Sequence, residues 1–307
     1  MAFPTTSESL TSLASFIPAI WGQKINDFFR LRLTVASFFV DRSEELADGG
    51  NILYTPNLSE MTANAKSNAT AVTLNGATES KITLTVDQWY EVSFAIEDRE
   101  AAQMKHSYYL QEKYAKNAGY SLAKKLEVAL TSLFSGFDAT VGTSGADLQD
   151  SIIRAAISAL EVNGVDVAVE PVAFFMSPAV FWKQVQNLDK FSLAVNSPVN
   201  DPTAKRPAAF LYGIPVHISN NIQFVSGSTG RYNALAHADA LHFATSPLGS
   251  GGSAWTQGAE NSMVGSMGIR VQSHYVAEYL STLTTADILY GVIENRGDGG
   301  IAIMSAA

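Results

Sequence analysis

The densest group of chemically capable side chains in this sequence is a short segment with two histidines and an aspartate. His237, Asp239 and His242 lie within six residues, and imidazole and carboxylate groups are ligands that Zn²⁺ accepts. The apolar run 231–245 predicts a buried strand, in which His237 and Asp239 would share one face and His242 would take the other. Because joint ligation would then need a turn or a bulge, we expect ordinary strand residues here and no metal site.

The other candidate groups are three solitary histidines, two adjacent carboxylate pairs and a glycine-rich segment: His106, His217, His274, Glu44–Glu45, Glu97–Asp98 and Gly249–Gly252. A lone histidine has many structural uses. Carboxylates at the start of a helix interact favourably with its dipole, which explains Glu97 and Asp98. The glycine-rich segment lacks the lysine and the following helix of a phosphate-binding loop, and no GxSxG motif marks a nucleophile. The sequence therefore predicts no catalytic residue, no cofactor and no metal.

The composition excludes further classes of function. The chain has 307 residues, 47% of them apolar, no cysteine and a formal net charge of −9. The lack of cysteine excludes a disulfide scaffold, thiol catalysis and cysteine-bound zinc, and proteins that read nucleic-acid sequence usually carry the opposite charge. No apolar run approaches the roughly 18 residues of a membrane helix, and the N-terminus lacks the basic start of a secretory signal. We expect a protein that is made in the cytosol and enters no membrane.

Two features of the sequence indicate contact with other protein. Charged residues make up only 16% of the chain, against about 25% in a typical soluble domain, so much of the uncharged surface is expected to face protein. Residues 1–50 are crowded with large apolar side chains, whereas loose termini are usually small and polar. This arm packs either under its own core or on a neighbouring subunit, and the sequence leaves both possibilities open.

The elements that follow the arm are extended and then helical. Alternating apolar residues between Asn51 and Glu97 surround a polar stretch at 59–72, which predicts a long hairpin with a polar tip. An isolated hairpin is marginally stable in water, so it needs a surface to lie on. From Glu97 to Phe134 the apolar residues step by threes and fours, with Leu122 and Leu126 on the apolar face. An unbroken helix there would be about 50–60 Å long at 1.5 Å per residue.

An α/β unit is predicted next. Asp147 is expected to cap a helix that ends at Val162, with a left-handed stop at Asn163–Gly164. Val172–Met176 predicts a buried strand, and Ser177 with Pro178 predicts the start of another helix, whose inner side would carry Phe181, Trp182, Val185 and Leu188. A turn at Gly213 enters a short strand, and alternation from Gly268 to Leu283 predicts one long strand.

This succession of elements resembles the major capsid proteins of tailed bacteriophages, whose Hong Kong-type fold is shared with encapsulin shells. The resemblance rests on the order of the segments and on three loose matches: ITLTVDQWYEVSFAIEDREAAQ before the long helix, LYGIPVHISNNI, and HADALHFATSP. It covers nearly the whole chain. It implies an α+β fold with an N-terminal arm at 1–50, an extended hairpin loop at 51–96, a spine helix and peripheral domain at 97–146, an axial domain at 147–264, a long strand of the peripheral domain at 265–284 and a return to the axial domain at 285–307.

The function that the resemblance implies is structural. Such a subunit assembles as hexamers and pentamers into an icosahedral shell around double-stranded DNA, is made in the bacterial cytoplasm and ends in the virion. Its implied partners are copies of itself, a separate scaffolding protein, a portal, a decoration protein and DNA bound without sequence preference. Lys66 and Lys81 lie in or beside the hairpin, but the sequence identifies no partner asparagine or catalytic acid, so the lysine–asparagine cross-linking of some relatives is not carried over to this chain. The alternatives are an encapsulin-type compartment and, more remotely, a metal-dependent hydrolase built on His237, Asp239 and His242.

Overall fold

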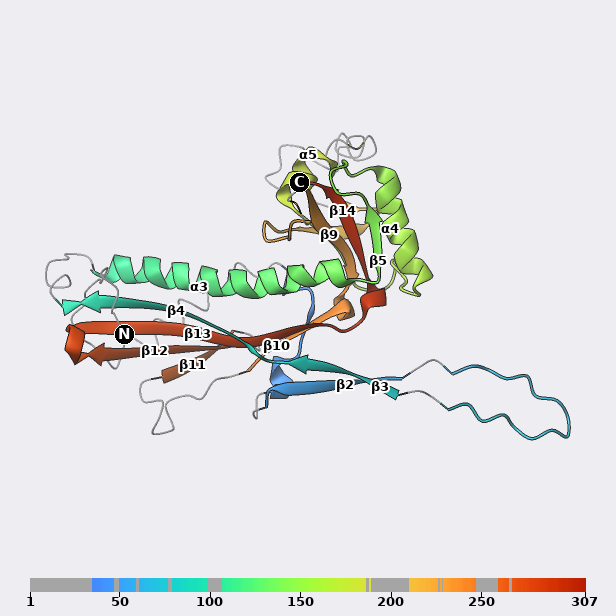
Figure 1. The fold of residues 1–307 in the computed structure, drawn as a ribbon, viewed down its shortest axis with the longest axis horizontal. Helices are drawn as coiled ribbons and strands as arrows, with labels where there is room; N and C mark the ends of the chain where they lie inside the picture. Colours follow the sequence, from blue (N-terminus) through green and yellow to red (C-terminus); the bar gives the residue numbers. More distant parts are fainter. Residues whose placement is uncertain are drawn as a thin grey trace.

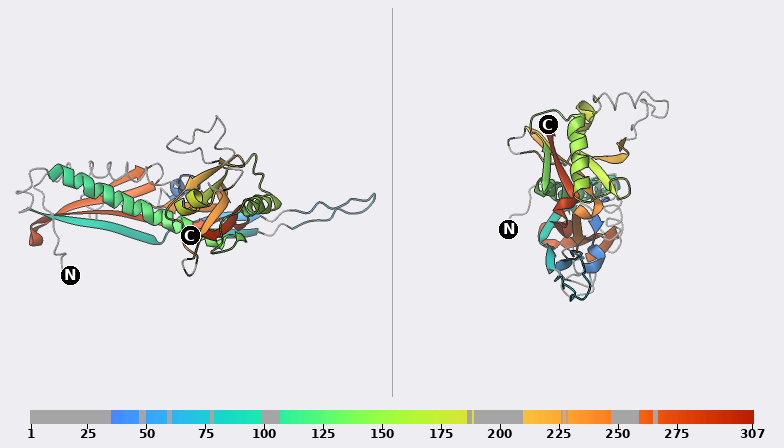
Figure 2. Two further views of the ribbon diagram at one scale, coloured as in Figure 1. Left: turned by 90° about the horizontal axis from the view of Figure 1, so that it is seen from above. Right: turned by 90° about the vertical axis from the view of Figure 1, so that its right-hand side faces the viewer.

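The computed structural model describes residues 35–46, 50–58, 61–76, 79–98, 107–185, 188, 210–225, 227, 229–246, 259–264 and 267–307. These residues form two bodies and a projecting hairpin (Figure 1). A long helix lies along one face of an elongated sheet, and a compact α/β unit sits at one end of that helix. Figure 2 shows that the hairpin extends the molecule along its long axis, while the view along that axis is narrow. The molecule is therefore elongated, with the compact unit on one side of its long axis and the hairpin at one end.

The elongated body is a six-stranded sheet covered by α3 (Ser107–Ser132). Its strands are β1 (Val40–Asp41), β10 (Leu241–Thr245), β13 (Ser281–Glu294), β12 (Met267–Val276) and β11 (Ala259–Val264), with β4 (Gln88–Glu97) paired to β13. Alternation in β4 turns Tyr90, Val92 and Phe94 towards the helix. Leu122 and Leu126 of α3 are fully buried against this face, which confirms the apolar side that the sequence predicted for the helix.

The compact body is a second six-stranded sheet flanked by α4 (Asp150–Val162) and α5 (Pro178–Lys183). Its strand order is β5 (Ala139–Gly142), β14 (Gly300–Ala306), β9 (Gly230–His237), β6 (Val172–Met176), β8 (Ile214–Ile218) and β7 (Phe210–Leu211). Every residue of β6 is buried, as its apolar run predicted. Gly213 has a φ of 83°, as the predicted turn before β8 requires, and the preceding Tyr212 also lies in the left-handed region.

The helix starts and stops of the compact body were predicted in part. The Ser177 side chain accepts a hydrogen bond from the Val180 amide with Pro178 in the first turn, and Gly164 has a φ of 89° after α4, as expected. Asp147 is not a cap, because α4 begins at Asp150 after Gln149. Trp182 was expected on the inner side of α5 but is 53% exposed, since Val180 and Phe181 fill that side instead.

The hairpin is shorter than the predicted range 51–96. It consists of β2 (Ile52–Leu58) and β3 (Glu79–Thr85), with Ile52 opposite Thr85. β4, which the prediction included in the hairpin, pairs along its whole length with β13. Alternation shows which face of a strand is buried but does not show its partner, so the sequence did not predict that the chain leaves the hairpin at Val86–Asp87. The described part of the tip, residues 61–76, is exposed throughout.

The predicted long strand at 268–283 is in fact a second hairpin. β12 ends at Val276, η5 (Ala277–Tyr279) turns the chain, and β13 returns antiparallel to β12. Leu280 makes the reversal in a left-handed conformation with a φ of 46°. No glycine, proline or asparagine marks this turn, so the alternation continued through it undetected. β13 then stays in the elongated body to Glu294, so the chain crosses to the compact body near 295–299 and not at 285.

The predicted strand at 231–245 is also two strands, and they belong to different sheets. β9 lies in the compact body and β10 in the elongated body, with η4 (Ala238–Ala240) between them. The predicted axial range 147–264 therefore includes β10 and β11, which pair in the elongated sheet. Both halves of 231–245 are apolar because each is buried in its own sheet, and apolar content alone cannot separate them.

The described end of the N-terminal arm packs within its own subunit. Val35, Ala36 and Phe39 are buried in the main core, where Phe39 stacks on Phe175 of β6 with ring centroids 5.1 Å apart. β1 pairs with β10. One of the two possibilities for the arm is thus realised for residues 35–46, while residues 1–34 lie outside the described residues.

Candidate assembly surfaces

The three residues of the candidate metal segment are brought together by η4, the kind of turn that joint ligation required. His237 Nδ1 lies 3.9 Å from Asp239 Oδ2, and His242 Nε2 lies 4.0 Å from Asp239 Oδ1. However, His237 Nδ1 already accepts a hydrogen bond from the Asp239 amide at 3.1 Å. Within the described parts of the chain, no group of three or more His, Cys, Asp or Glu side chains has the arrangement to hold a metal ion.

The solitary histidines have separate surroundings. His217 of β8 stacks on the Phe175 ring at 5.4 Å between centroids, and burial lowers the pKa of its imidazole. His274 is exposed on β12. His106 and the glycine-rich segment 249–252 lie outside the described residues.

The carboxylate pairs also have structural partners. Glu45 binds Arg42, whose side-chain hydrogen bonds hold the pKa of that carboxyl below its ordinary value. Glu97 ends β4, and Asp98 accepts a hydrogen bond of 2.6 Å from the Tyr275 hydroxyl. Asp98 is the first helical residue after β4, as expected for this pair, and residues 99–106 between it and Ser107 lie outside the described residues.

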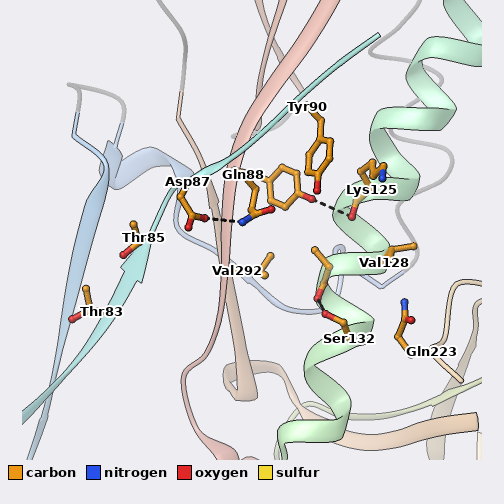
Figure 3. A pocket seen from close by; sticks show the side chains of 12 residues that line it. Thr83, Thr85, Asp87, Gln88, Tyr90, Lys125, Val128, Ser132, Gln223 and Val292 are labelled. Atoms are coloured by element: carbon orange, nitrogen blue, oxygen red, sulfur yellow. Dashed lines mark hydrogen bonds between the residues drawn. The ribbon is translucent and has the colours of Figure 1, made fainter. Parts of the chain in front are cut away.

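A cavity of about 610 Å³ lies where the base of the hairpin meets α3 and β13. Figure 3 shows its lining: Tyr90 and Lys125 stand side by side, and Thr83, Thr85 and Asp87 approach from the hairpin side. Lys125 Nζ lies 4.8 Å from the centre of the Tyr90 ring, and the Tyr290 hydroxyl donates to the Lys125 carbonyl oxygen at 3.3 Å. Burial raises the pKa of Tyr290 far above its ordinary value, so this hydroxyl stays protonated. The cavity offers hydrogen-bonding groups but no pair of groups arranged for acid–base catalysis.

The hairpin exposes apolar side chains along its length. Ile52 and Tyr54 on β2 and Met61, Val72 and Leu74 in the tip are all exposed, and Leu74 is 90% exposed. Lys81 Nζ lies 4.3 Å from the centre of the Tyr54 ring, while Lys66 Nζ donates to the Ser67 carbonyl oxygen at 3.0 Å within the tip. The base of the hairpin packs on its own subunit through Leu53 and Leu84, whereas the tip at 61–76 is exposed throughout.

The outer face of the elongated sheet carries an exposed tryptophan in a fixed position. Trp89 is 63% exposed, yet its indole Nε1 donates to Asp287 Oδ2 at 2.9 Å. Asp287 is buried and is held by Arg270 through two bonds of 3.0 and 2.6 Å. Three neighbouring strands thus position one aromatic ring at the surface, and tryptophan and arginine are enriched in the contacts that dominate protein interfaces. Sequence reasoning placed Trp89 on a strand but missed this role, because its partners are nearly 200 positions away.

Two further groups of exposed large apolar side chains lie on the compact body and at the end of the elongated sheet away from that body (Figure 1). The first group is Trp182, Phe210 and Tyr212, and the second is Tyr275, Tyr279 and Leu280. Monomeric proteins rarely leave so many large apolar side chains exposed in groups, and such patches usually contact another protein. These exposed groups are therefore the candidate contact surfaces of the described residues.

A buried polar link fixes the compact body to the long helix. Glu127 of α3 is buried and accepts hydrogen bonds from Ser219 Oγ at 2.7 Å and Asn221 Nδ2 at 2.9 Å. Thr131 Oγ1 donates to the Asn221 carbonyl oxygen at 2.9 Å. Ser219 and Asn221 belong to the ISNNI segment, which is part of one of the matches behind the resemblance. In the structure these two residues connect the compact body to α3.

These features define a fold class: a helix along an elongated sheet, a compact α/β body at its end and a projecting hairpin. No family model matches the chain, and no curated protein matches its sequence. Solved structures do match. The mature capsid of bacteriophage PhiM1 is 13% identical with a TM-score of 0.63, over 86% of this chain and 84% of that one. The chain has the α+β fold of tailed-phage major capsid proteins, as the resemblance implied.

Two other matches show how widely this fold is shared. The capsid of cyanophage P-SCSP1u is 13% identical with a TM-score of 0.62, covering 88% of this chain and 86% of that one. A virus-like particle from Pyrococcus furiosus is 8% identical with a TM-score of 0.56, covering 93% of this chain and 98% of that one. In the described residues, no helix is both long and apolar enough to cross a membrane.

Proposed function

We propose that this chain is the structural subunit of the icosahedral head of a tailed bacteriophage. Copies assemble as hexamers and pentamers into a shell that encloses double-stranded DNA without reading its sequence. The subunit is made in the bacterial cytoplasm, becomes part of the virion and carries no enzymatic activity. Its further partners are a separate scaffolding protein, a portal and a decoration protein.

The observation that carries this proposal is the hairpin. Among the described strands β2 and β3 pair only with one another, and the tip exposes Met61, Val72 and Leu74 to solvent. A two-stranded ribbon is marginal by itself. The base of this one packs on its own subunit, but the tip needs the surface of another molecule. A closed shell of identical copies gives every hairpin such a surface.

The negative charge of the chain supports a DNA container. With a net charge of −9, a shell wall repels the phosphate backbone and keeps packaged DNA from adhering to it. The same balance would not suit a protein that binds DNA tightly, because phosphate contacts require lysine and arginine.

Negative-stain electron microscopy of the overexpressed protein tests the proposal directly. We expect closed particles or partial shells with hexameric and pentameric units. A monodisperse monomer in light scattering, from cells that also contain no particles, would contradict it.

A second candidate function is a protein compartment that encloses other proteins. The likeness to the Pyrococcus furiosus particle, which extends over 93% of this chain, supports this second function. Mass spectrometry of purified particles separates the two functions. DNA with portal and tail proteins supports the phage head, whereas a packaged enzyme in every particle supports the compartment.

A further inference from the structure

The backbone crosses between the two bodies at one junction. In the described part of the chain, three segments pass between the bodies: η2 (Leu133–Gly136) with Asp138, η4, and η6 (Gly297–Gly299). The Asp138 amide donates to the Gly297 carbonyl oxygen at 3.3 Å, and the amides of residues 295 and 296 both donate to the Ala240 carbonyl oxygen. Because the three crossings are bonded to one another, a change in the angle between the bodies must alter these contacts.

His242 lies beside this junction with a buried, unpartnered nitrogen. The residue is 7% exposed, and its Nε2 atom has no hydrogen-bond partner. Asp239 Oδ1, in η4, lies 4.0 Å from that nitrogen, beyond hydrogen-bonding distance. A neutral imidazole tolerates this position, but an imidazolium would present an N–H that needs an acceptor.

The charged groups around His242 come from two elements. Arg42 and Glu45 approach from the segment after β1, where Arg42 binds Glu45 at 2.6 Å and Thr55 of the hairpin at 2.6 Å. Asp239 approaches from η4. On the flanking strands the residues opposite His242 are apolar, Val40 on β1 and Ile293 on β13.

The remaining charges of the junction act on Asp239. Arg296 is bound to Asp298 at 3.0 Å, and its charge also interacts with Asp239 and Glu170. His237 Nε2 faces Glu170 at 3.4 Å. The carboxylates of Asp239, Glu170 and Asp298 thus lie around a single guanidinium, that of Arg296.

We propose that His242 is a pH-sensitive latch on the junction between the two bodies. The neutral imidazole is compatible with the hydrogen bonds that join the three crossings, and its protonation weakens them. A protonated Nε2 gains an acceptor only if Asp239 moves roughly 1 Å closer. The backbone of Asp239 is tied into the junction, because its amide donates to His237 Nδ1 at 3.1 Å and its carbonyl oxygen accepts from Asn295 Nδ2 at 3.2 Å. A shift of this backbone therefore reaches both η4 and the segment that leads into η6.

The sign of the effect follows from the surroundings. Burial, and then the positive charge of Arg42, lower the pKa of His242, while Asp239 and Glu45 act in the opposite direction. A histidine whose pKa is lowered in the folded protein stabilises the native arrangement while it is neutral. That contribution is lost as the pH falls from the ordinary histidine pKa of 6.5 through the lowered value.

Amide hydrogen exchange of the full chain tests the latch. Protection at residues 238–242 and 293–299 is measured between about pH 7.5 and pH 5 and corrected for the intrinsic pH dependence of exchange. We expect protection in the wild-type protein to fall at least about tenfold towards pH 5. In His242→Gln, which keeps a polar side chain without a titrating charge, the fall should disappear.

A matched variant serves as the control. His274→Gln, on the exposed part of β12, should keep the wild-type fall. An equal fall in His242→Gln, or no fall in the wild type, would overturn the proposal. If His242→Gln fails to fold, two further measurements decide. Asp239→Asn should move the fall in protection to lower pH, and an unchanged fall would refute the latch. An NMR titration of the wild-type imidazole should give a midpoint below 6.5, and a midpoint at or above 6.5 would also refute it.

Discussion

At the scale of single residues, the buried carboxylate of Glu127 shows how a polar group can join two parts of a protein. It lies on the helix of one body and accepts hydrogen bonds from Ser219 and Asn221 of the other. A buried charge that loses a partner costs more than an ordinary hydrogen bond, because its desolvation is no longer offset. The link therefore specifies where the compact body sits along α3.

Asn221→Ala tests this link. The substitution removes one of the donors to the Glu127 carboxylate, so we expect the free energy of unfolding to fall by about 1–3 kcal/mol. Urea denaturation followed by fluorescence measures the change. The neighbouring Asn220 is exposed, and Asn220→Ala should change the free energy by less than about 0.5 kcal/mol. Equal effects of the two variants would show that the link contributes nothing.

Glu294, the last residue of β13, gives a pH-dependent prediction. Burial first, and then the nearby Asp138, raise the pKa of its carboxyl. Ionised Glu294 thus lowers the stability of the native state, and this cost appears as the pH rises from the ordinary value of 4.5 through the raised one. Glu294→Gln should therefore raise the urea midpoint at pH 8 and leave it nearly unchanged at about pH 4, where both states are protonated.

The matched control for that prediction is Glu44→Gln, because Glu44 is exposed in η1 (Ser43–Leu46). It should change the midpoint little at either pH. A Glu294→Gln variant that is destabilised more at pH 8 than at pH 4 would contradict the expected sign, and would indicate that the ionised carboxylate has a favourable partner.

At the scale of elements, the sequence predicted the units well and their pairing poorly. The β6 strand, the Ser177 cap and the apolar face of α3 follow from local periodicity and capping chemistry, which act within a few residues. The turn at Leu280 does not, because its segment carries no turn residue, and the change of sheet at η4 does not, because Asp239 is a single turn residue within an apolar run. Nothing in an alternating stretch states which distant strand will pair with it.

The contact surfaces were predictable only in outline. Low charge and an apolar arm pointed to protein contacts, and the polar tip pointed to a projecting hairpin. The position of Trp89 against Asp287 and Arg270 was not predictable, since it depends on the register of β4, β13 and β12. The His242 environment likewise required the η4 turn, which replaces the strand that the sequence suggested.

Deleting the hairpin tip separates folding from assembly. The residues 61–76 are exposed and contribute nothing to the buried cores, so their removal should leave the unfolding midpoint of the subunit nearly unchanged. Particle formation should fall sharply, because the tip is expected to pack on a neighbouring copy. Circular dichroism monitors the first quantity and electron microscopy the second. Normal particles from the shortened chain would show that the tip is dispensable.

At the scale of the whole molecule, the exposed groups lie on separate elements. The compact body exposes Trp182, the turn between β12 and β13 exposes Tyr279, and β4 exposes Trp89. A subunit with several separate contact surfaces can join more than one neighbour at a time, which a closed shell requires.

Trp89→Ala tests the contact surface on β4. Because the ring is mostly exposed, we expect little change in the unfolding midpoint of the subunit. If the ring anchors a neighbouring subunit, the binding free energy of that contact should weaken by about 2 kcal/mol or more. Particle yield from sucrose gradients should therefore fall well below the wild type. Arg270→Lys, which keeps the charge but not the paired hydrogen bonds to Asp287, should give a smaller loss in the same direction. Full yield from Trp89→Ala would remove this residue from the assembly surface.

The order of strands in the compact sheet has a consequence for synthesis. β14, formed by residues 300–306, lies between β5 and β9, and Asn233 of β9 donates to the Ile303 carbonyl oxygen at 3.3 Å and to Ser305 at 2.9 Å. β5 joins the rest of the sheet only through β14 in the described residues. Residues 139–142 therefore cannot take their place in the sheet until residues 300–306, about 160 positions later, have been synthesised.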